Sequence, residues 1–461
     1  MSRTPKKKEL KAKEIKPVLS APKAEPKKTS GPQLLRGMKD ILPAEQRYWD
    51  FIRERSAKLA GAYSFERIDT PVLEETKLFT RAVGKYTDIV EKEMFTFLDA
   101  GEESVTLRPE GTAPVVRAYI NHGMLNLPQP VKLWYLGPMF RYGRPQSGSY
   151  RQFHQWGLEI LGEAKPAADA ELIFLAYTLC KELGLRVVVH INSLGHPGCR
   201  EQYKNELVDY YKTKRSQICD DCKRRLLRNP LRVLDCKEEK CQPVKQGAPQ
   251  MVDKLCDEDR NHFMKVLEFL DEIDLPYQLN PYLVRGLDYN TRTVFEIFAQ
   301  NSDESISSSA LGGGGRYDDL AELMGGRPTP GVGFALGIER LILALKEQNV
   351  NVPDPQPPFV YLAQLGDHAK RKALTLFEEI RAAGIPATVN FAKDSLKTQM
   401  ELSAKLNVRY TIILGQKEVL DGTVILRDMD SGVQEVVDRK KIVDALKKKR
   451  AAESFDLNHK E

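Results

Sequence analysis

Two runs of the sequence carry side chains that a plain β-strand does not need. They are LGPMFRYGRPQSGSYRQFHQWGLE at 136–159 and LVRGLDYNTRTVFEI at 283–297, and together they hold Arg141, Arg144, Arg151 and Arg285. A guanidinium can grip phosphate or carboxylate oxygens at two points, which a lysine cannot do. Gln155 and Glu159 are four residues apart and fall on one face of a strand. The two runs therefore predict a site for a polyphosphate beside a small polar molecule.

The cysteines form a second group with chemical potential. Cys219 and Cys222 make a CxxC pair, and Cys236 and Cys241 follow as CxxxxC. Two such pairs can supply four thiolates to a structural zinc ion. The second spacing is looser than the common one, so a set of reduced cysteines is the alternative. Cys180, Cys199 and Cys256 are expected to lie outside any such site.

Glycines and histidines give weaker signals. Gly312 to Gly315 precede Arg316 and Tyr317 in the run GGGGRYDDL. Glycine permits positive φ and close approach of the backbone to a ligand, although a plain turn would also use it. His154 and His190 invite a general-base role, but a lone histidine beside aromatic residues on a strand is more often structural.

Composition predicts a soluble, globular protein with more than one domain. The chain has 461 residues and 41% hydrophobic content, too long for one ordinary core. No run approaches about 20 apolar residues, and lysines and prolines stand where a signal peptide would have an apolar segment. Seven cysteines without a secretory signal argue for reduced thiols. We expect a cytoplasmic protein that does not span a membrane.

Positive charge is concentrated at the N-terminus. Residues 1–31 contain ten Lys or Arg and three Glu, so the rest of the chain sums to −1 although the whole carries +6. This segment has almost no bulky apolar groups and is predicted to be disordered. It would attract phosphate backbones in a salt-sensitive manner or simply improve solubility.

The elements that must position these residues can be read from hydrophobic patterning. A helix is predicted over 43–62, with Trp49, Ile52 and Leu59 facing the core. Strands are predicted at 105–107, 131–136, 152–160 and 186–191, in series and without a helix between each pair. This order favours an antiparallel sheet and an α+β fold. Charged, helix-prone sequence at about 196–275 predicts an insertion, after which the runs at 283–297 and 312–341 complete the sheet and lead into a helix from about Ile338.

A proline-rich linker at 351–358 precedes a predicted small α/β domain at 359–448. Strand-like runs (FVYLAQ, ATVNF, RYTIIL, TVILRDM) alternate there with helices near 366–383 and 394–406. A charged tail follows at 449–461. From the residues alone, this domain could be any small α/β module.

The two opening runs, together with TLRPEGT at 106–112, GGGGRYDDL at 312–320 and GVGFALGIERL at 331–341, resemble the histidine-tRNA ligases, which are class II aminoacyl-tRNA synthetases. The resemblance extends from about Leu35 to about Leu446 in the family's order. It implies a catalytic domain at 32–350 on an antiparallel sheet, an insertion that leans on the tRNA acceptor end, and a C-terminal anticodon-binding domain. It also implies a homodimer, with Thr70, Pro71 and Val72 near the interface.

The resemblance implies a reaction and its participants. ATP, accompanied by Mg²⁺, and L-histidine would form histidyl adenylate, and the histidyl group would then pass to histidine tRNA. The catalytic and ATP-binding residues would be Arg141, Arg285 and Arg340. The histidine-binding residues would be Glu110, Gly111, Thr112, Arg141, Gln155, Glu159, Arg285, Tyr289, Asn290 and Tyr317. The alternative, purely structural roles are a surface ion pair for Arg285 and a buried aromatic side chain for Tyr317.

Three positions depart from the family's pattern. Gly143 stands where an acidic residue is usual, Ser149 replaces an arginine, and Asn290 replaces a tyrosine that normally meets the imidazole. Asparagine is shorter but can still donate or accept a hydrogen bond. The rival interpretation is a relative that does not charge tRNA and serves as a regulatory subunit of ATP phosphoribosyltransferase. That group characteristically lacks the C-terminal domain.

Overall fold

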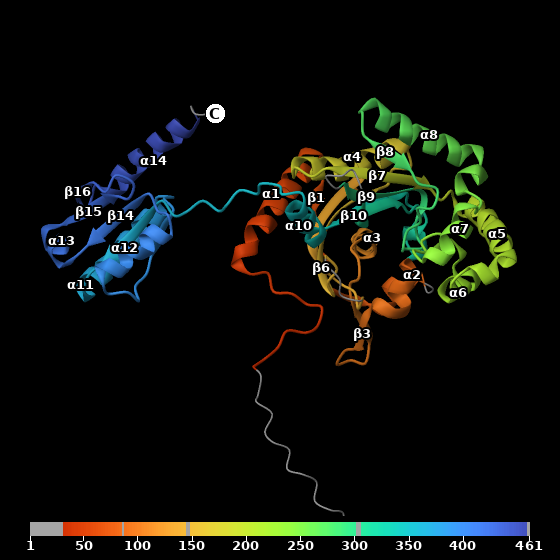
Figure 1. The fold of residues 1–461 in the computed structure, drawn as a ribbon, viewed down its shortest axis with the longest axis horizontal. Coiled ribbons are helices and arrows are strands. Elements are labelled where there is room, and N and C mark those ends of the chain that lie inside the picture. Colours follow the sequence, from red (N-terminus) through yellow and green to blue (C-terminus); the bar gives the residue numbers. More distant parts are fainter. Residues whose placement is uncertain (1–30, 85–86, 144–147, 301–305, 459–461) are drawn as a thin grey trace, which may run out of the picture. The chain divides into compact units, whose positions relative to one another are not determined.

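The computed structural model describes residues 31–84, 87–143, 148–300 and 306–458, so the expected basic tail and Arg144 fall outside the described residues. The chain forms two compact units, Met1–Asn351 and Val352–Glu461. Each is considered separately below (Figure 1). In the described part of the chain, no helix has the length and apolar character needed to cross a membrane.

The first unit is built on an eight-stranded sheet in the order β1-β5-β6-β11-β10-β9-β7-β8. All neighbours pair antiparallel except β1 with β5 and β7 with β8, which are parallel. This confirms the predicted α+β class. The strands are β1 Glu66–Arg67, β5 Val131–Phe140, β6 Gln152–Leu161, β7 Val187–Ser193, β8 Tyr277–Leu279, β9 Thr291–Gln300, β10 Ile306–Arg316 and β11 Gly331–Gly337.

One face of this sheet is covered by helices. α4 packs on β7, β9, β10 and β11, α8 packs on α4, and α1 packs on α4 and α10. Trp49, Ile52 and Leu59 of α1 are buried, as predicted. The helices are α1 Gln46–Ala62, which follows the 3₁₀ turn η1 Pro43–Glu45, α4 Pro166–Glu182, α8 Asp257–Glu272 and α10 Ile338–Glu347. Shorter helices pack on the opposite face of the sheet, and the cavity described below also opens on that face.

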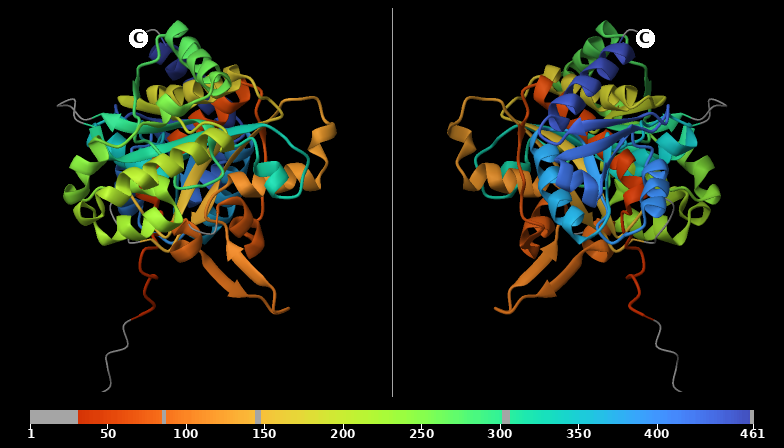
Figure 2. Two further views of the ribbon diagram at one scale, coloured as in Figure 1. Left: turned by 90° about the vertical axis from the view of Figure 1, so that its right-hand side faces the viewer. Right: turned by 90° about the vertical axis from the view of Figure 1, so that its left-hand side faces the viewer.

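On that opposite face, α2 Thr76–Ala82, α3 Thr112–Asn121 and α9 Leu320–Leu323 share a core with Tyr135, Tyr289 and Tyr317. A separate three-stranded sheet, in the order β2-β4-β3, projects from this side (Figure 2). Its strands are β2 Leu73–Glu75, β3 Phe95–Leu98 and β4 Ser104–Leu107. Short helical turns occur nearby at η2 Ile89–Glu93 and η3 Met124–Asn126.

Two details of the predicted sheet were wrong. The strand at 105–107 belongs to the small sheet and not to the large one. In addition, α3 separates β4 from β5 and α4 separates β6 from β7, so the strands do not follow one another without helices. α4 is apolar on most of its surface and its helical period is correspondingly weak, which hid it from the sequence pattern.

The insertion has its own helices and its own core. They are α5 Pro197–Thr213, η4 Arg215–Gln217, α6 Asp220–Arg228, η5 Pro230–Val233, η6 Glu239–Cys241, α7 Gln242–Gln246 and η7 Met251–Lys254, followed by α8. Figure 1 shows α5, α6 and α7 gathered on one side of the first unit. Their core includes Leu226, Leu231 and Val244 and continues into Leu283 and Val284. The insertion is therefore packed against the segment that carries Arg285.

The second unit is a five-stranded sheet in the order β13-β12-β14-β15-β16. Its strands are β12 Val360–Gln364, β13 Ala387–Val389, β14 Tyr410–Leu414, β15 Thr423–Asp428 and β16 Gln434–Asp438. Its helices are α11 Asp367–Ala382, α12 Leu396–Lys405, α13 Gln416–Asp421 and α14 Ile442–Asn458. The helices predicted near 366–383 and 394–406 are present, and the unit has hydrophobic clusters of its own.

Candidate active site

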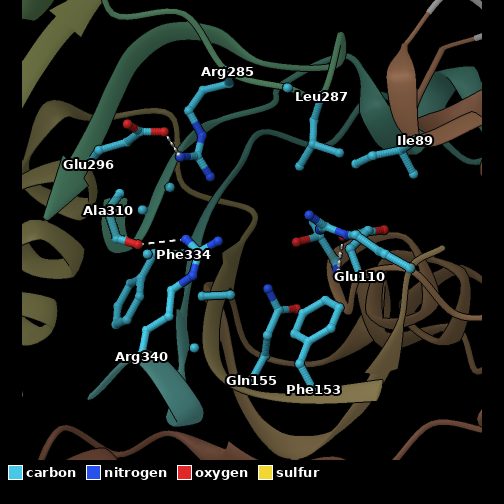
Figure 3. A pocket seen from close by; sticks show the side chains of 18 of the residues that line it. Ile89, Glu110, Phe153, Gln155, Arg285, Leu287, Glu296, Ala310, Phe334 and Arg340 are labelled. Atoms are coloured by element: carbon cyan, nitrogen blue, oxygen red, sulfur yellow. Dashed lines mark hydrogen bonds and ion pairs between the residues drawn. The ribbon is translucent and has the colours of Figure 1, made fainter. Parts of the chain in front are cut away.

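A cavity of about 780 Å³ opens on the face of the large sheet opposite α4. This volume is typical of a pocket for a small-molecule ligand. Its lining comes from β5, β6, β9, β10 and β11, from the start of α3, and from the segments 89–93 and 285–290. Figure 3 shows the cavity with Arg285 and Arg340 along one side and Glu110 on the other.

Three arginines from three separate elements line this cavity. Arg141 follows β5, where its Nε donates to the Pro109 carbonyl at 2.8 Å and its guanidinium lies 5.3 Å from the centre of the Phe153 ring. Arg340 lies in the first turn of α10 and donates to the Ala310 carbonyl at 2.6 Å. Each bond fixes one edge of a guanidinium and leaves other donors for a ligand.

Arg285 comes from the segment before β9, and its Nη1 lies 2.7 Å from Glu296 Oε1. Its Nε is buried and has no partner among the described residues. Burial lowers the pKa of the Arg340 guanidinium, and the positive charge of Arg285 lowers it further. The two guanidiniums together are a suitable receptor for a polyphosphate, whose negative charge would offset the repulsion that Arg285 exerts on Arg340.

Glu110 lies at the N-terminus of α3 and lines the cavity. Its carboxylate accepts the backbone N–H groups of Thr112 at 2.7 Å and Ala113 at 2.8 Å. Burial raises the pKa of Glu110, and the two backbone bonds oppose that effect. An ammonium group bound here would stabilise the carboxylate, so the position suits the amino end of an amino acid.

Two amide side chains in the cavity wall are available to a ligand. Gln155 Oε1 and Asn290 Oδ1 are buried without a hydrogen-bond partner among the described residues. Asn290 is 3% exposed, and its Nδ2 donates to the Arg316 carbonyl at 3.3 Å. A buried polar atom without a partner is costly, so these two oxygens indicate a ligand that donates hydrogen bonds.

Glu159 lies behind the wall of the cavity and is not one of its lining residues. It accepts hydrogen bonds from the Thr112 hydroxyl at 2.7 Å and the Tyr317 hydroxyl at 2.5 Å. Burial raises the pKa of Glu159 to about 8, against the effect of these two bonds. The raised pKa favours the protonated carboxyl near neutral pH, in which the carboxyl O–H would donate in one of these two contacts; in either form the side chain ties Thr112 to Tyr317.

Most of the predicted histidine-binding residues meet in the cavity. Eight of the ten line it, namely Glu110, Thr112, Arg141, Gln155, Arg285, Tyr289, Asn290 and Tyr317. Glu159 and Gly111 do not. Gly111 allows the start of α3 to pass close to Tyr135, because a Cβ at position 111 would lie 2.2 Å from the tyrosine ring.

The four glycines were expected to allow positive φ and close approach of the backbone to a ligand, with a plain turn as the alternative. Gly312 to Gly315 belong to β10, and none of them has positive φ. They allow close packing of neighbouring strands instead, since a Cβ at Gly314 would lie 2.1 Å from the Gly333 carbonyl oxygen. All four also line the cavity. The strand β10 excludes the alternative of a plain turn, which had been considered because strand interiors seldom tolerate so many glycines.

The two other positions that depart from the family's pattern also line the cavity. A Cβ at Gly143 would have Glu93 Oε1 as its nearest neighbour, at 4.0 Å. Ser149 accepts a hydrogen bond from Arg340 Nη2 at 3.4 Å. Glu93 and Glu296 line the cavity too and were not selected from the sequence. A lone carboxylate in the apolar run TVFEIFA was the available signal for Glu296.

Neither predicted histidine lines the cavity. His154 Nδ1 lies 2.9 Å from Glu339 Oε1, and its ring packs edge-on against Trp49. His190 lies on β7, with Asn280 Nδ2 at 3.3 Å from its Nδ1. Their surroundings agree with the structural alternative.

The four cysteines of the predicted metal site converge in the insertion. The Sγ atoms of Cys219, Cys222, Cys236 and Cys241 all lie within 4.8 Å of one another. Cys219 to Cys236 and Cys222 to Cys241 are each 3.9 Å apart. Zinc–sulfur bonds of about 2.3 Å place tetrahedral ligands about 3.8 Å apart, so the donor set fits zinc.

A second group of residues that could bind a metal consists of His196, Cys199, Cys256 and Asp259. One potential ligand atom from each residue lies within 4.8 Å of the other three. His196 Nδ1 lies 2.7 Å from Asp259 Oδ2 and Arg292 Nε lies 3.0 Å from Asp259 Oδ1. Direct hydrogen bonding explains this arrangement without a metal ion.

Comparison with known proteins places these features in a family. The family described as Histidyl-tRNA synthetase matches residues 37–341, and the one described as Anticodon binding domain matches residues 359–449. A histidine–tRNA ligase of Desulforudis audaxviator is 49% identical over 414 residues, covering 90% of this chain and 98% of that protein. One from Desulforamulus reducens is 47% identical over 409 residues, covering 88% and 97%.

A solved structure agrees. The crystal structure of apo S. aureus histidyl-tRNA synthetase is similar with a TM-score of 0.75 at 36% identity, covering 90% of this chain and 99% of that one.

Proposed function

Because the chain belongs to the histidyl-tRNA synthetase family, we propose that it attaches L-histidine to histidine tRNA through a histidyl-adenylate intermediate. The observation that carries this proposal is the convergence of Arg141, Arg285 and Arg340 in one cavity with Glu110 and the unpartnered amide oxygens of Gln155 and Asn290. One part of the cavity suits a polyphosphate and the other suits a small amino acid.

The chemistry requires positioning and charge stabilisation. A carboxylate oxygen of histidine attacks the α-phosphorus of ATP, and the bond to pyrophosphate breaks. A ribose hydroxyl of the terminal adenosine of the tRNA then attacks the histidyl carbonyl, AMP leaves, and the hydroxyl proton is released. Neither step needs a protein nucleophile, so positive charge aimed at the reacting phosphate is the principal aid. We assign this role to Arg285 and Arg141, and the outer phosphates to Arg340.

Histidine would be recognised at both ends. Glu110 would accept the α-ammonium group, and Gln155, Asn290 and Tyr317 would surround the ring. A neutral imidazole has one donor and one acceptor. A substrate unable to pair with the buried amides would leave them unsatisfied, which is a strong basis for rejecting other amino acids.

Two metal ions accompany this proposal. Mg²⁺ would bind with ATP and neutralise charge on the departing pyrophosphate. Zn²⁺ would bind Cys219, Cys222, Cys236 and Cys241, whose separations support tetrahedral coordination. We also propose that the protein works in the cytoplasm as a homodimer, with Thr70, Pro71 and Val72 near the interface.

The alternative, a regulatory subunit that does not charge tRNA, is not favoured. That group characteristically lacks the C-terminal domain, whereas residues 359–449 of this chain match the family described as Anticodon binding domain. We propose that this domain binds the anticodon of the tRNA.

The decisive experiment is exchange of pyrophosphate into ATP without tRNA, measured with each amino acid in turn. Histidine alone should support exchange. Arg285→Ala should slow it about 100- to 1,000-fold, as expected for loss of a group that stabilises transition-state charge. Arg327→Ala, at an exposed position, is the matched control and should stay within about twofold. Exchange with another amino acid, or with none, would contradict the proposal.

A further inference from the structure

The insertion presents a row of polar side chains to two segments, residues 87–93 and 285–290, that contribute to the lining of the active-site cavity. The row lies between the inner pair of cysteines, Cys222 and Cys236, on α6 and η5. It consists of Arg225, Arg228, Asn229 and Arg232, and is called here the arginine row.

The arginine row contacts three acidic residues. Asp88 Oδ2 lies 3.4 Å from Arg225 Nη2 and 3.2 Å from Arg232 Nη2. Arg228 Nη1 lies 3.0 Å from Glu91 Oε1. Asn229 Nδ2 donates to Asp288 Oδ1 at 2.8 Å. Every member of the row therefore contacts one of the two segments.

These acidic residues are direct neighbours of the cavity wall. Asp88 precedes Ile89 and Glu91 precedes Lys92, and Asp288 lies between Leu287 and Tyr289; all four of these neighbours line the cavity. The Asp288 N–H also donates to the carbonyl of Val83, at the C-terminal end of α2, at 3.1 Å. A shift of the arginine row would move both segments.

Asp88 is the one acidic residue of the set that two arginines of the row contact. Arg232 is 14% exposed, in contrast to Arg228 at 62%. Burial tends to raise the pKa of Asp88, but the charges of Arg225 and Arg232 outweigh it and hold the pKa of that carboxyl below its usual range. Lys92 Nζ adds a weaker interaction at 3.6 Å. Partly buried ion pairs of this kind couple more strongly than exposed ones.

The segment that carries the arginine row consists of short elements held by a few buried side chains. α6 has nine residues and buries Cys222 and Leu226, and η5 is a single 3₁₀ turn that buries Leu231 and Val233. Isolated helices of this length are marginal in water. Bonds from one metal ion to Cys222 and Cys236 would close the segment into a loop and fix its two ends.

We propose that a zinc ion bound by the four cysteines fixes the arginine row, and that the row positions the segments at 87–93 and 285–290 for histidine and ATP. Arg232 and Asp88 are thus positioning residues that act on the cavity from outside it. The kinetic part of this inference rests on the proposed function, whereas the metal site and the order of the two segments do not depend on it.

Metal content of the full-length protein is the first test. Purified without chelator, it should hold about one zinc ion per chain. Cys236→Ser should lose the metal, and Cys180→Ser, a buried cysteine in α4, should keep it. A protein that neither contains zinc nor takes up added zinc would overturn the proposal.

The second test measures order directly. Amide hydrogen exchange at 87–93 and 285–290 should become faster when the metal is removed, and also in Arg232→Ala with the metal bound. Arg224→Ala is the matched control, because Arg224 lies on the same helix as Arg225 and pairs with exposed Asp221. Equal exchange in Arg232→Ala and Arg224→Ala would contradict the role of the arginine row.

The third test separates binding from chemistry. Arg232→Ala and Asp88→Asn should each raise the KM for histidine or ATP about five- to tenfold with kcat within about twofold, and the double variant should be no worse than either alone. Removing zinc from Arg232→Ala should add little further change. Additive effects would overturn the coupling. If the unaltered protein supports no pyrophosphate exchange, the proposed function fails. The metal content and the amide hydrogen exchange still test the present inference in that case.

Discussion

Asn290 is the residue at which the cavity differs most clearly from the tyrosine usual in the family. Its side chain is buried, its Nδ2 is bonded to the Arg316 carbonyl, and a Cβ at Gly315 would lie 3.0 Å from that nitrogen. The space around it is thus adapted to an amide. A larger ring would have to enter the cavity.

Asn290→Tyr is therefore expected to raise the KM for histidine about tenfold or more, since the ring would occupy space needed by the substrate. Histidine-dependent exchange measures this directly. Asn290→Asp, which keeps the size but not the amide donor, is the companion variant. A KM that falls in Asn290→Tyr would mean that the cavity retains room for the family's tyrosine.

Glu159 gives a prediction about pH. Burial raises its pKa from the ordinary 4.5 to about 8, so between these values the folded protein holds a proton that the unfolded chain has lost. The stability contributed by this group is present in full below about pH 4.5 and is lost as pH rises toward 8. Glu159→Gln removes the titrating group.

Between pH 6 and 8, the free energy of unfolding of the unaltered protein should consequently fall more steeply with pH than that of Glu159→Gln. The difference in slope should correspond to about one proton more bound by the folded state than by the unfolded state. Urea titrations at several pH values provide the measurement. Parallel slopes for the two proteins would show that Glu159 is already ionised in the folded state.

At this scale the sequence revealed residue types more readily than their exact positions. Arginines and amides could be selected because a strand interior has no need of them. Glu159 also looked like a contact residue, since its spacing from Gln155 places both on one face of β6. Only the packing of Thr112 and Tyr317 over it determines that it lies behind the wall.

Among the elements, β10 depends most on a special composition. Its glycines lie between β9 and β11 at a separation that leaves no room for a Cβ, as at Gly314, where the nearest atom would be 2.1 Å away. The run at 312–341 was predicted to complete the sheet, but the bounds of β10 could not be read from it, because glycine has no side chain that could alternate between the two faces. The strands β5, β6 and β7 of the same sheet were predicted because their apolar residues do alternate or run continuously.

Gly314→Ala should accordingly reduce the free energy of unfolding by about 1–3 kcal/mol, because backbone and strand neighbours must move apart. Gly61→Ala, in α1 with nothing within 4 Å of the added Cβ, is the control and should be neutral or stabilising by up to about 1 kcal/mol. Chemical denaturation of both variants tests the difference. Equal stabilities would contradict the packing argument.

At the scale of the whole molecule, each unit has its own hydrophobic core. The proline-rich stretch was a clear signal for a boundary, because prolines at 353, 355, 357 and 358 interrupt regular structure. The architecture of each unit was less accessible, since pairing between distant strands, such as β6 with β11, leaves no mark in local sequence.

A fragment ending at residue 351 is therefore expected to retain histidine-dependent pyrophosphate exchange and to lose charging of histidine tRNA by about 100-fold or more, because the cavity is complete within the first unit. Exchange and charging assays on one preparation distinguish the two activities. Retention of full charging would show that the second unit does not contribute to tRNA binding.

The linker between the units also governs how their affinities combine. Four prolines within residues 352–358 favour an extended, semi-rigid linker. If one unit holds the acceptor end and the other the anticodon, the tRNA is a bivalent ligand, and the linker sets the effective concentration of the second contact once the first has formed. Two individually weak contacts then give high avidity. Lengthening the spacer would lower that avidity without altering either binding surface.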